Sequence, residues 1–281
     1  MPINKIKSYA KINLSLGVIK KVKKLHRIES LIAFIDLHDT IYIKKNNKKS
    51  HSVKFYGKFS NRITSNNSIF KLIKLLDKRN LLKGKKYSFI VNKKIPQQSG
   101  MGGGSMNAAA ILKYFLRKKI LILNKKEIEK ISYSIGSDVP LGLDNRNSIL
   151  LHNGKIQRVK KRLRLFLLIV KPPMGCSTKI IYKNVRKFSK PQINKNYKFN
   201  FKLKNLMKLK NDLEKIAIKK YPTLLTLKKI LEKLPRVKFV RMTGSGSAFI
   251  AYFVSKKSAL IAAKFLKSKS NNYWSIISKT I

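Results

Sequence analysis

Acidic residues are scarce in this sequence: 11 Asp and Glu stand against 65 Lys and Arg, which gives a formal net charge of +54. Such an excess usually indicates a nucleic-acid partner. Arginine, which nucleic-acid sites favour for bidentate contacts, accounts for only 11 of the 65, and the 54 lysines are spread over the whole chain. Lys, Asn and Ile, all abundant here, have A/T-rich codons, so biased genome composition explains the charge. We expect no specific nucleic-acid binding, only weak binding at low salt.

Cysteine and long apolar runs are also nearly absent. The single cysteine, Cys176, excludes an internal disulfide and fits a reducing compartment. The longest apolar run, residues 165–170, has the length of a buried strand and is far too short for a membrane span. No signal-peptide pattern is visible at the N-terminus. These features predict a cytoplasmic protein without a membrane partner.

The chain has 281 residues, of which 43% are hydrophobic, and this predicts a globular protein of two domains. We place the boundary near Asn153-Gly154, so that the domains span residues 1–154 and 155–281. In the second domain, apolar runs predict strands at 165–170, 237–242, 248–254 and 274–277. Helical periodicity predicts helices at 206–218, 224–234 and 259–267. An α+β fold follows.

Glycine is concentrated in one stretch, where four glycines fall within positions 100–104. Alternating apolar residues predict a strand before it, and helical periodicity follows it from Ala108. Ser105 or Asn107 could cap that helix. Backbone N–H groups and the positive end of the helix dipole then converge on the loop, which suits phosphate. The loop matches neither a Walker A nor a dinucleotide fingerprint, and a turn without a ligand is the alternative.

The sequence Pro-x-x-x-Gly-Met-Gly-Gly-Gly-Ser at 96–105 resembles the ATP loop of the GHMP kinase superfamily. The continuation Ser-x-Asn-Ala-Ala is most similar to the members that phosphorylate a cytidyl diphosphate sugar alcohol in isoprenoid biosynthesis. The resemblance implies a two-domain fold with the active site in the cleft between the domains, and ATP with Mg²⁺ as cofactors. It also implies that the loop residues bind ATP: Pro96, Gln97, Gln98, Ser99, Gly100, Met101, Gly102, Gly103, Gly104, Ser105, Met106 and Asn107.

Residues 10–18 alternate between apolar and polar side chains, which predicts a strand with Lys11 and Asn13 on one face. A half-buried strand with a solvated polar face is one interpretation. The segment Ala-Lys-Ile-Asn-Leu also resembles the first motif of the superfamily, which implies a catalytic Lys11 and a substrate-binding Asn13. Gly-x-Asp-Val-Pro at 136–140 resembles another signature, and it implies that Asp138 is the catalytic carboxylate. Alternatively, Asp138 only caps a helix that has Pro140 in its first turn.

Further motifs imply the remaining contacts. His-x-x-Glu-Ser-Leu, beginning at His26, and the aromatic Tyr182 match positions that hold the cytosine, although Leu25 stands where the family has a tyrosine. Asn67 matches a residue near the adenine, but it could simply cap the next helix. Thr-Gly-Ser-Gly at 243–246 resembles the third superfamily motif, with Gly244, Ser245 and Gly246 near the phosphates; a hairpin turn is the alternative.

The resemblance therefore implies a kinase that transfers phosphate from ATP to the C2 hydroxyl of a cytidyl diphosphate sugar alcohol. Lys11 would neutralise charge on the transferred group, and Ser105 would meet phosphate or the metal. The family commonly has a second serine at the place of Met106, which puts the Mg²⁺ geometry in question. The alternatives are another small-molecule kinase of the superfamily, of homoserine or mevalonate type, and a non-catalytic RNA-binding scaffold. We expect a monomer or weak homodimer.

Overall fold

A computed structural model describes residues 2–23, 25–61, 63–64, 66–160, 163–193, 201–270 and 272–281. The chain forms two compact units that interleave along the sequence. Unit 1 consists of Met1–Lys11, Leu37–Pro96 and Gly102–Asn145, and unit 2 of Ile12–Asp36, Gln97–Met101 and Arg146–Ile281. The two domains predicted from sequence are each continuous in the chain, whereas these units are not. The division into units therefore does not test the predicted boundary, which stays a prediction. Both units contain strands and helices, and the predicted α+β class is confirmed.

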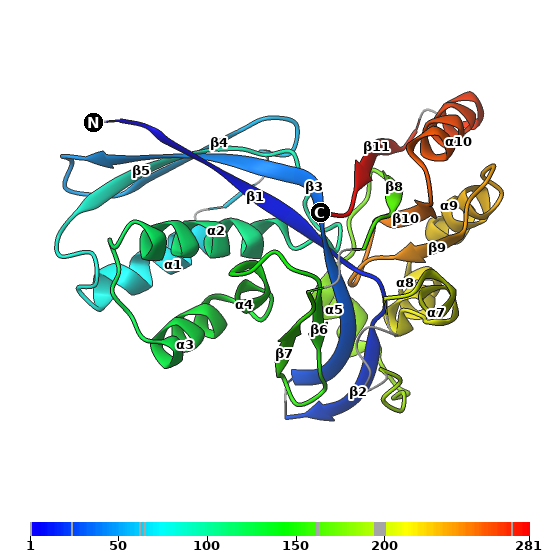
Figure 1. The fold of residues 1–281 in the computed structure, drawn as a ribbon, viewed down its shortest axis with the longest axis horizontal. Helices are drawn as coiled ribbons and strands as arrows, with labels where there is room; N and C mark the ends of the chain where they lie inside the picture. Colours follow the sequence, from blue (N-terminus) through cyan, green and yellow to red (C-terminus); the bar gives the residue numbers. More distant parts are fainter. Residues whose placement is uncertain are drawn as a thin grey trace. The chain divides into compact units, whose positions relative to one another are not determined.

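Strands and helices form separate layers in unit 1. Strands β1 (Asn4–Asn13) and β3 (Leu25–Asn46) reach into this unit, where residues Thr40–Asn46 of β3 pair antiparallel with β5 (Lys86–Asn92). Strand β4 (Ser52–Tyr56) runs parallel to β5, and β1 pairs with β3. Helices α1 (Ser68–Lys78), α2 (Gly103–Arg117), α3 (Lys125–Ile135) and α4 (Val139–Gly142) lie on one side of these strands (Figure 1).

Helical periodicity explains how this layer packs. Helix α1 buries a stripe spaced by three and four residues: Ile69, Leu72, Ile73 and Leu76. Helix α2 places Phe115 against the sheet, with its ring centroid 4.9 Å from that of Tyr87. Helix α3 ends at Ile135, immediately before Gly136. The core of unit 1 therefore fixes the helix that follows the glycine loop.

Unit 2 contains two groups of strands. In the first, β2 (Gly17–Val22) and β6 (Ser148–Leu150) pair with β3, and β7 (Ile156–Arg158) pairs with β6. The second is an antiparallel sheet in the order β11-β8-β10-β9, with β8 at Phe166–Lys171, β9 at Phe239–Met242, β10 at Phe249–Phe253 and β11 at Trp274–Lys279. All four strands occur where the sequence predicted them.

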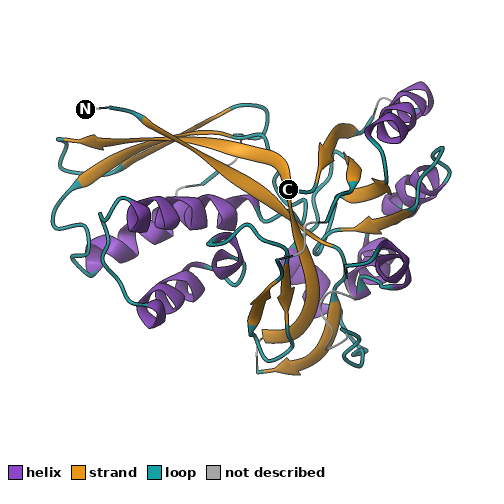
Figure 2. Cartoon of the chain, viewed as in Figure 1, coloured by secondary structure: helices purple, strands orange, loops and turns teal. Residues whose placement is uncertain are grey.

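Unit 2 also contains several helices, drawn purple in Figure 2. They are α5 (Thr178–Lys183), α7 (Leu203–Lys208), α8 (Asp212–Lys220), α9 (Thr223–Glu232) and α10 (Lys256–Lys269). The helix predicted at 206–218 is wrong as one element, because the chain breaks between α7 and α8. Asn211 starts the new helix, because its side-chain oxygen accepts a hydrogen bond from the Leu213 N–H. Its side-chain NH₂ group donates to the Met242 carbonyl. No helix in the described part of the chain has the length and apolarity to cross a membrane.

Candidate active site

The second half of the glycine loop forms the N-terminus of α2 in unit 1. The N-cap residue is Gly102, in the left-handed conformation (φ 68°), and no side chain caps the helix. The prediction that Ser105 or Asn107 caps α2 is therefore wrong, because the helix begins at Gly103 and both residues lie inside it. Since the first N–H groups of a helix have no intrahelical partner, an end without a side-chain cap suits an anion.

The first half of the loop packs against the Thr-Gly-Ser-Gly segment of unit 2. The N–H groups of Ser247 and Ala248 donate to the carbonyls of Gln98 and Ser99, at 3.0 and 3.4 Å. Gly100 has φ +76°, and a Cβ there would lie 1.9 Å from the Thr243 carbonyl oxygen. Only glycine fits this approach. The first half of the loop is thus held by backbone contacts and by the absence of a side chain.

Lys11 and Asp138 meet at the start of α2. The Lys11 Nζ lies 3.2 Å from Asp138 Oδ2, and the carboxylate side chain is 32% exposed. A Cβ on Gly102 would lie 3.0 Å from Lys11 Cε and 3.5 Å from Asp138 Oδ2, so glycine lets the pair approach the helix end. Asp138 occupies the N-cap position of α4 but makes no capping hydrogen bond. Capping therefore does not account for this aspartate.

The polar face of the first motif is buried. Lys11 is 5% and Asn13 3% exposed, so the interpretation as a solvated strand face is wrong. Strand β1 ends at Asn13, and the chain leaves the strand before β2 starts at Gly17, so the strand predicted over 10–18 is divided. Asn13 donates through its side-chain amide to the Ser30 hydroxyl at 2.8 Å, and its N–H donates to Thr243 Oγ1 at 3.0 Å.

Three further predicted residues of unit 1 lie around the α2 terminus. Asn67 is the N-cap of α1 and accepts hydrogen bonds from the Ile69 and Phe70 N–H groups, so capping is its visible role, and adenine contact stays a prediction. The Ser105 hydroxyl lies 3.6 Å from where a Cβ on Gly136 would stand, next to the turn that carries Asp138. The Met106 side chain is directed elsewhere: it is buried, and its sulfur would lie 3.0 Å from a Cβ on Gly142.

Sequence reasoning missed a buried ion pair that supports the loop. Lys93 pairs with Asp39, and both are buried. The other Asp39 oxygen accepts hydrogen bonds from the Lys94 and Ile95 N–H groups, at 2.8 and 2.9 Å. A Cβ on Gly103 would lie 3.4 Å from Lys93 Nζ. Asp39 therefore fixes the chain that enters the glycine loop. The available signal was an acid, Asp39, within the largely apolar segment 31–43 of so basic a chain.

The predicted phosphate loop at 243–246 is well anchored within unit 2. The Asn211 side-chain amide donates to the carbonyls of Met242 and Gly244, both at 2.8 Å. The Ser245 and Thr178 hydroxyls are 2.8 Å apart. Because Thr178 begins α5, which carries Tyr182, this hydrogen bond joins the loop to the predicted cytosine site. Gly246 has φ +87°, which favours glycine.

His26 and Tyr182, predicted to hold the cytosine, lie together in unit 2 with ring centroids 5.2 Å apart. Phe188, which the sequence analysis missed, lies on the same histidine at 6.4 Å and is 47% exposed. Leu25 is 75% exposed. Burial, and secondarily the charge of Lys21, lower the pKa of His26 below its usual value. The neutral imidazole is favoured, with one nitrogen as donor and the other as acceptor.

Similarity to known proteins can be set beside this geometry. The family described as "GHMP kinases N terminal domain" matches residues 67–150, and "GHMP kinases C terminal" matches residues 201–272. A 4-diphosphocytidyl-2-C-methyl-D-erythritol kinase of Pelagibacter ubique is 52% identical over 277 residues, covering 99% of both chains. The chain belongs to the GHMP kinase family. A kinase of the same name from Thermodesulfovibrio yellowstonii is 32% identical and covers 98% of this chain and 97% of its own.

Solved structures show the GHMP kinase fold over the whole chain. A crystal structure of a 4-(cytidine 5'-diphospho)-2C-methyl-D-erythritol kinase superposes with a TM-score of 0.79 at 21% identity, covering 99% of this chain and 100% of that one. The homoserine kinase from Cytophaga hutchinsonii gives a TM-score of 0.72 at 14% identity, covering 100% and 95%. The resemblance seen in the glycine loop is thus confirmed as family membership. The roles of individual residues stay predictions.

Proposed function

We propose that this GHMP kinase transfers the γ-phosphoryl group of ATP to the C2 hydroxyl of 4-diphosphocytidyl-2-C-methyl-D-erythritol. The observation that carries the proposal is the Lys11–Asp138 pair, 3.2 Å apart, beside the α2 terminus. The substrate is inferred from two kinases of that name that are 52% and 32% identical over nearly the full chain. The predicted ATP loop and the cytosine site stay part of the proposal.

The chemistry follows from the chain's own groups. Phosphoryl transfer needs positioning and charge neutralisation more than covalent catalysis. The N–H groups at the start of α2 would hold phosphate oxygens. Asp138, with its carboxylate 32% exposed, would accept or orient the proton of the attacking hydroxyl. The Lys11 ammonium would offset negative charge on the group in transfer.

Oxygen donors suited to Mg²⁺ are present near this pair. Within the described residues, no three His, Cys, Asp or Glu side chains cluster as a metal site. Mg²⁺ does not need such a cage, because it commonly takes one or two protein oxygens together with phosphates and waters. The Ser105 hydroxyl would supply one such oxygen, and the bound ion would neutralise phosphate charge. Met106 replaces a hydroxyl, but its side chain packs against Gly142, away from this group.

A coupled assay of ADP release tests the proposal. We expect turnover with 4-diphosphocytidyl-2-C-methyl-D-erythritol, and at least about a hundredfold lower kcat/KM with homoserine or mevalonate, because the cytosine contacts would be missing. A control substrate that equals or exceeds the cytidyl compound would assign the chain to another activity of the GHMP kinase family.

The net charge of +54 is the one observation that favours a nucleic-acid function. Dispersed lysine predicts binding that is independent of sequence and disappears near physiological salt. Titration of duplex DNA and RNA between low and physiological salt measures this. A tight complex that persists in high salt, in a protein that does not turn over ATP, would favour the scaffold function instead.

A further inference from the structure

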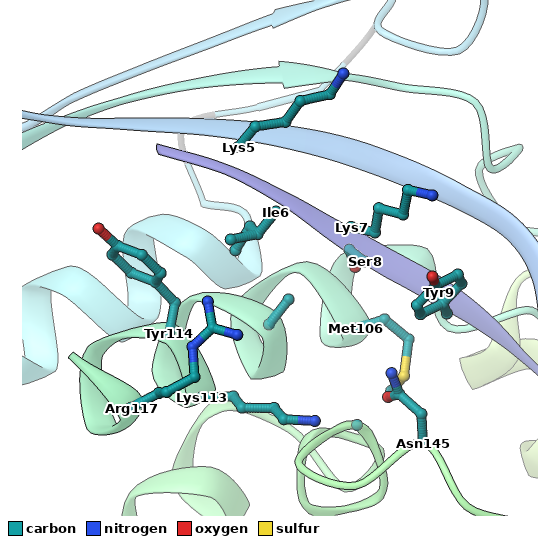
Figure 3. A pocket seen from close by; sticks show the side chains of 12 residues that line it. Lys5, Ile6, Lys7, Ser8, Tyr9, Met106, Lys113, Tyr114, Arg117 and Asn145 are labelled. Atoms are coloured by element: carbon teal, nitrogen blue, oxygen red, sulfur yellow. The ribbon is translucent and has the colours of Figure 1, made fainter. Parts of the chain in front are cut away.

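Unit 1 contains a cavity of about 270 Å³ that the proposed reaction does not use. It lies between β1 and the helices α2 and α4, and we call it the β1–α2 cavity (Figure 3). Neither Lys11 nor Asp138 lines it. Its wall includes Ile6 and Ser8 of β1, Met106, Lys113 and Arg117 of α2, and Gly142 of α4.

Cations line the β1–α2 cavity without an acid to balance them. Lys113 and Arg117, four residues apart, lie on the same face of α2, and Figure 3 shows both extending beneath β1. None of the described residues that line the cavity is acidic. Because basic residues are common everywhere in this chain, their presence alone does not indicate a ligand. Lys5 and Lys7 also line the cavity, but alternation along β1 places their side chains on the exposed side of the strand, opposite Ser8. The charges of Lys113 and Arg117 nevertheless favour an anion in the cavity.

Ser8 supplies an observation that does not depend on charge. It is 1% exposed, and its hydroxyl has no hydrogen-bond partner among the residues that the structure describes. Alternation along β1 puts Ile6 and Ser8 on the more buried side of the strand, and both line the cavity. A buried hydroxyl without a partner is unfavourable, so such groups are rare in folded proteins. A ligand oxygen in the cavity would satisfy it.

We propose that the β1–α2 cavity binds the phosphate group of a small phosphorylated molecule. Arg117 presents a planar fork suited to phosphate oxygens, and Lys113 adds a second charge. A phosphate monoester carries close to two negative charges at neutral pH and balances both cations, whereas a carboxylate balances one. Ile6, Ala110 and Met106 provide an apolar wall for a short carbon chain. The volume lies just below the usual range for small-molecule pockets, which suits a small ligand.

The cavity also gives Met106 a function that the ATP loop does not. A Cβ on Gly142 would lie 2.6 Å from the Ala109 Cβ and 3.0 Å from the Met106 sulfur, so α4 approaches α2 closely only with glycine there. Met106 follows Ser105 in α2, and Gly142 ends the short helix whose N-cap is Asp138. A methionine side chain adapts readily to a ligand. The cavity is therefore connected by two short helical segments to the proposed catalytic pair.

Methionine methyl NMR tests the proposal without relying on activity. The chain has six methionines; the Met106 signal reports on the cavity, the Met101 signal reports on the glycine loop, and Met106→Leu assigns the former. Butyl phosphate, butyrate and inorganic phosphate are titrated separately at physiological salt. We expect butyl phosphate to shift Met106 at the lowest concentration, with affinity at least about tenfold above butyrate because of the second charge. Inorganic phosphate should bind more weakly than butyl phosphate, since it lacks the apolar part.

Variants distinguish specific binding in the cavity from non-specific binding of an anion to a basic protein. Lys113→Ala and Ser8→Ala should each weaken butyl phosphate binding several-fold. Lys118→Ala, which removes the same charge from an exposed residue outside the lining, should leave it unchanged. Ser8→Ala should not lower the melting temperature, because it removes an unsatisfied hydroxyl. The proposal is overturned if Lys118→Ala weakens binding as much as Lys113→Ala, if butyrate binds as well as butyl phosphate, or if Met101 alone shifts.

Discussion

The Lys11–Asp138 pair in unit 1 and the His26 cluster in unit 2 (His26, Tyr182 and Phe188) differ in how strictly they follow their family. The pair keeps both predicted residues, and Gly102 leaves room for it. The cluster has the exposed Leu25 where the sequence analysis expected an aromatic, while Phe188 lies against the same histidine. Charge at a reacting centre needs defined atoms at defined distances, whereas a flat base needs only flat apolar surface. We infer that the reacting centre tolerates less change.

Asp138→Asn tests the Lys11–Asp138 pair and should have the largest effect on activity. The amide cannot accept the proton, so we expect kcat to fall about 10²–10⁴-fold, with ATP affinity unchanged because the loop would hold the phosphates. Steady-state kinetics and ATP titration measure the two effects. Glu129→Gln, the same change on an exposed surface, is the matched control. Near-normal turnover of Asp138→Asn would remove the catalytic role.

Asp39→Asn tests whether the buried ion pair that supports the glycine loop also tolerates little change. It leaves the buried Lys93 charge unpaired, which typically costs about 3–5 kcal/mol of the free energy of unfolding. Denaturant unfolding measures this. Lys86→Gln, which breaks the partly exposed pair with Asp77, should cost less than about 1 kcal/mol. The double variant Asp39→Asn, Lys93→Met should recover part of the loss. Equal effects at the two pairs would contradict the buried role.

Substitutions around His26 should change KM and leave kcat nearly constant, because the cytosine of the substrate is not part of the phosphoryl group that is transferred. An aromatic–base contact is worth about 1–3 kcal/mol, so Tyr182→Ala should raise the KM for the cytidyl substrate by about tenfold. Phe188→Ala should raise it less, since this ring is more exposed, and Leu25→Tyr should lower it. If Phe188→Ala has no effect while Leu25→Tyr does, Phe188 does not replace the missing aromatic.

The smallest expected effect is a dependence of KM on pH, which arises from the titration of His26. Burial lowers its pKa below the usual 6.5, so the neutral form persists below that pH in the folded protein. In the unfolded chain His26 has its usual pKa, so it binds a proton at a higher pH than in the folded protein. The free energy of unfolding is therefore greater above pH 6.5 and decreases as the pH falls toward the folded pKa. We expect a constant KM from pH 8 to 6.5 and a rise below it. His26→Gln, which does not titrate, should abolish that rise; an unchanged rise would assign the titration to another group.

Local patterns in the sequence determined much of this protein. Short apolar runs predicted the four strands of the second sheet, because a run of this length fits a buried strand. The glycine loop and the Gly-x-Asp-Val-Pro segment indicated the family, since both motifs are contiguous. Boundaries were less accurate where a polar side chain starts an element, as at Asn211.

Only the tertiary structure decided what depends on residues far apart in the chain. It brought Asp39 to Lys93, placed Phe188 on His26, and set Lys11 against Asp138 without the helix cap that the sequence allowed. It also left the Ser8 hydroxyl buried in the β1–α2 cavity without a partner among the described residues. Periodicity reports which face of a strand or helix is covered, but not which side chain covers it. That choice depends on packing between distant segments, because a buried charge or hydroxyl must find its partner there.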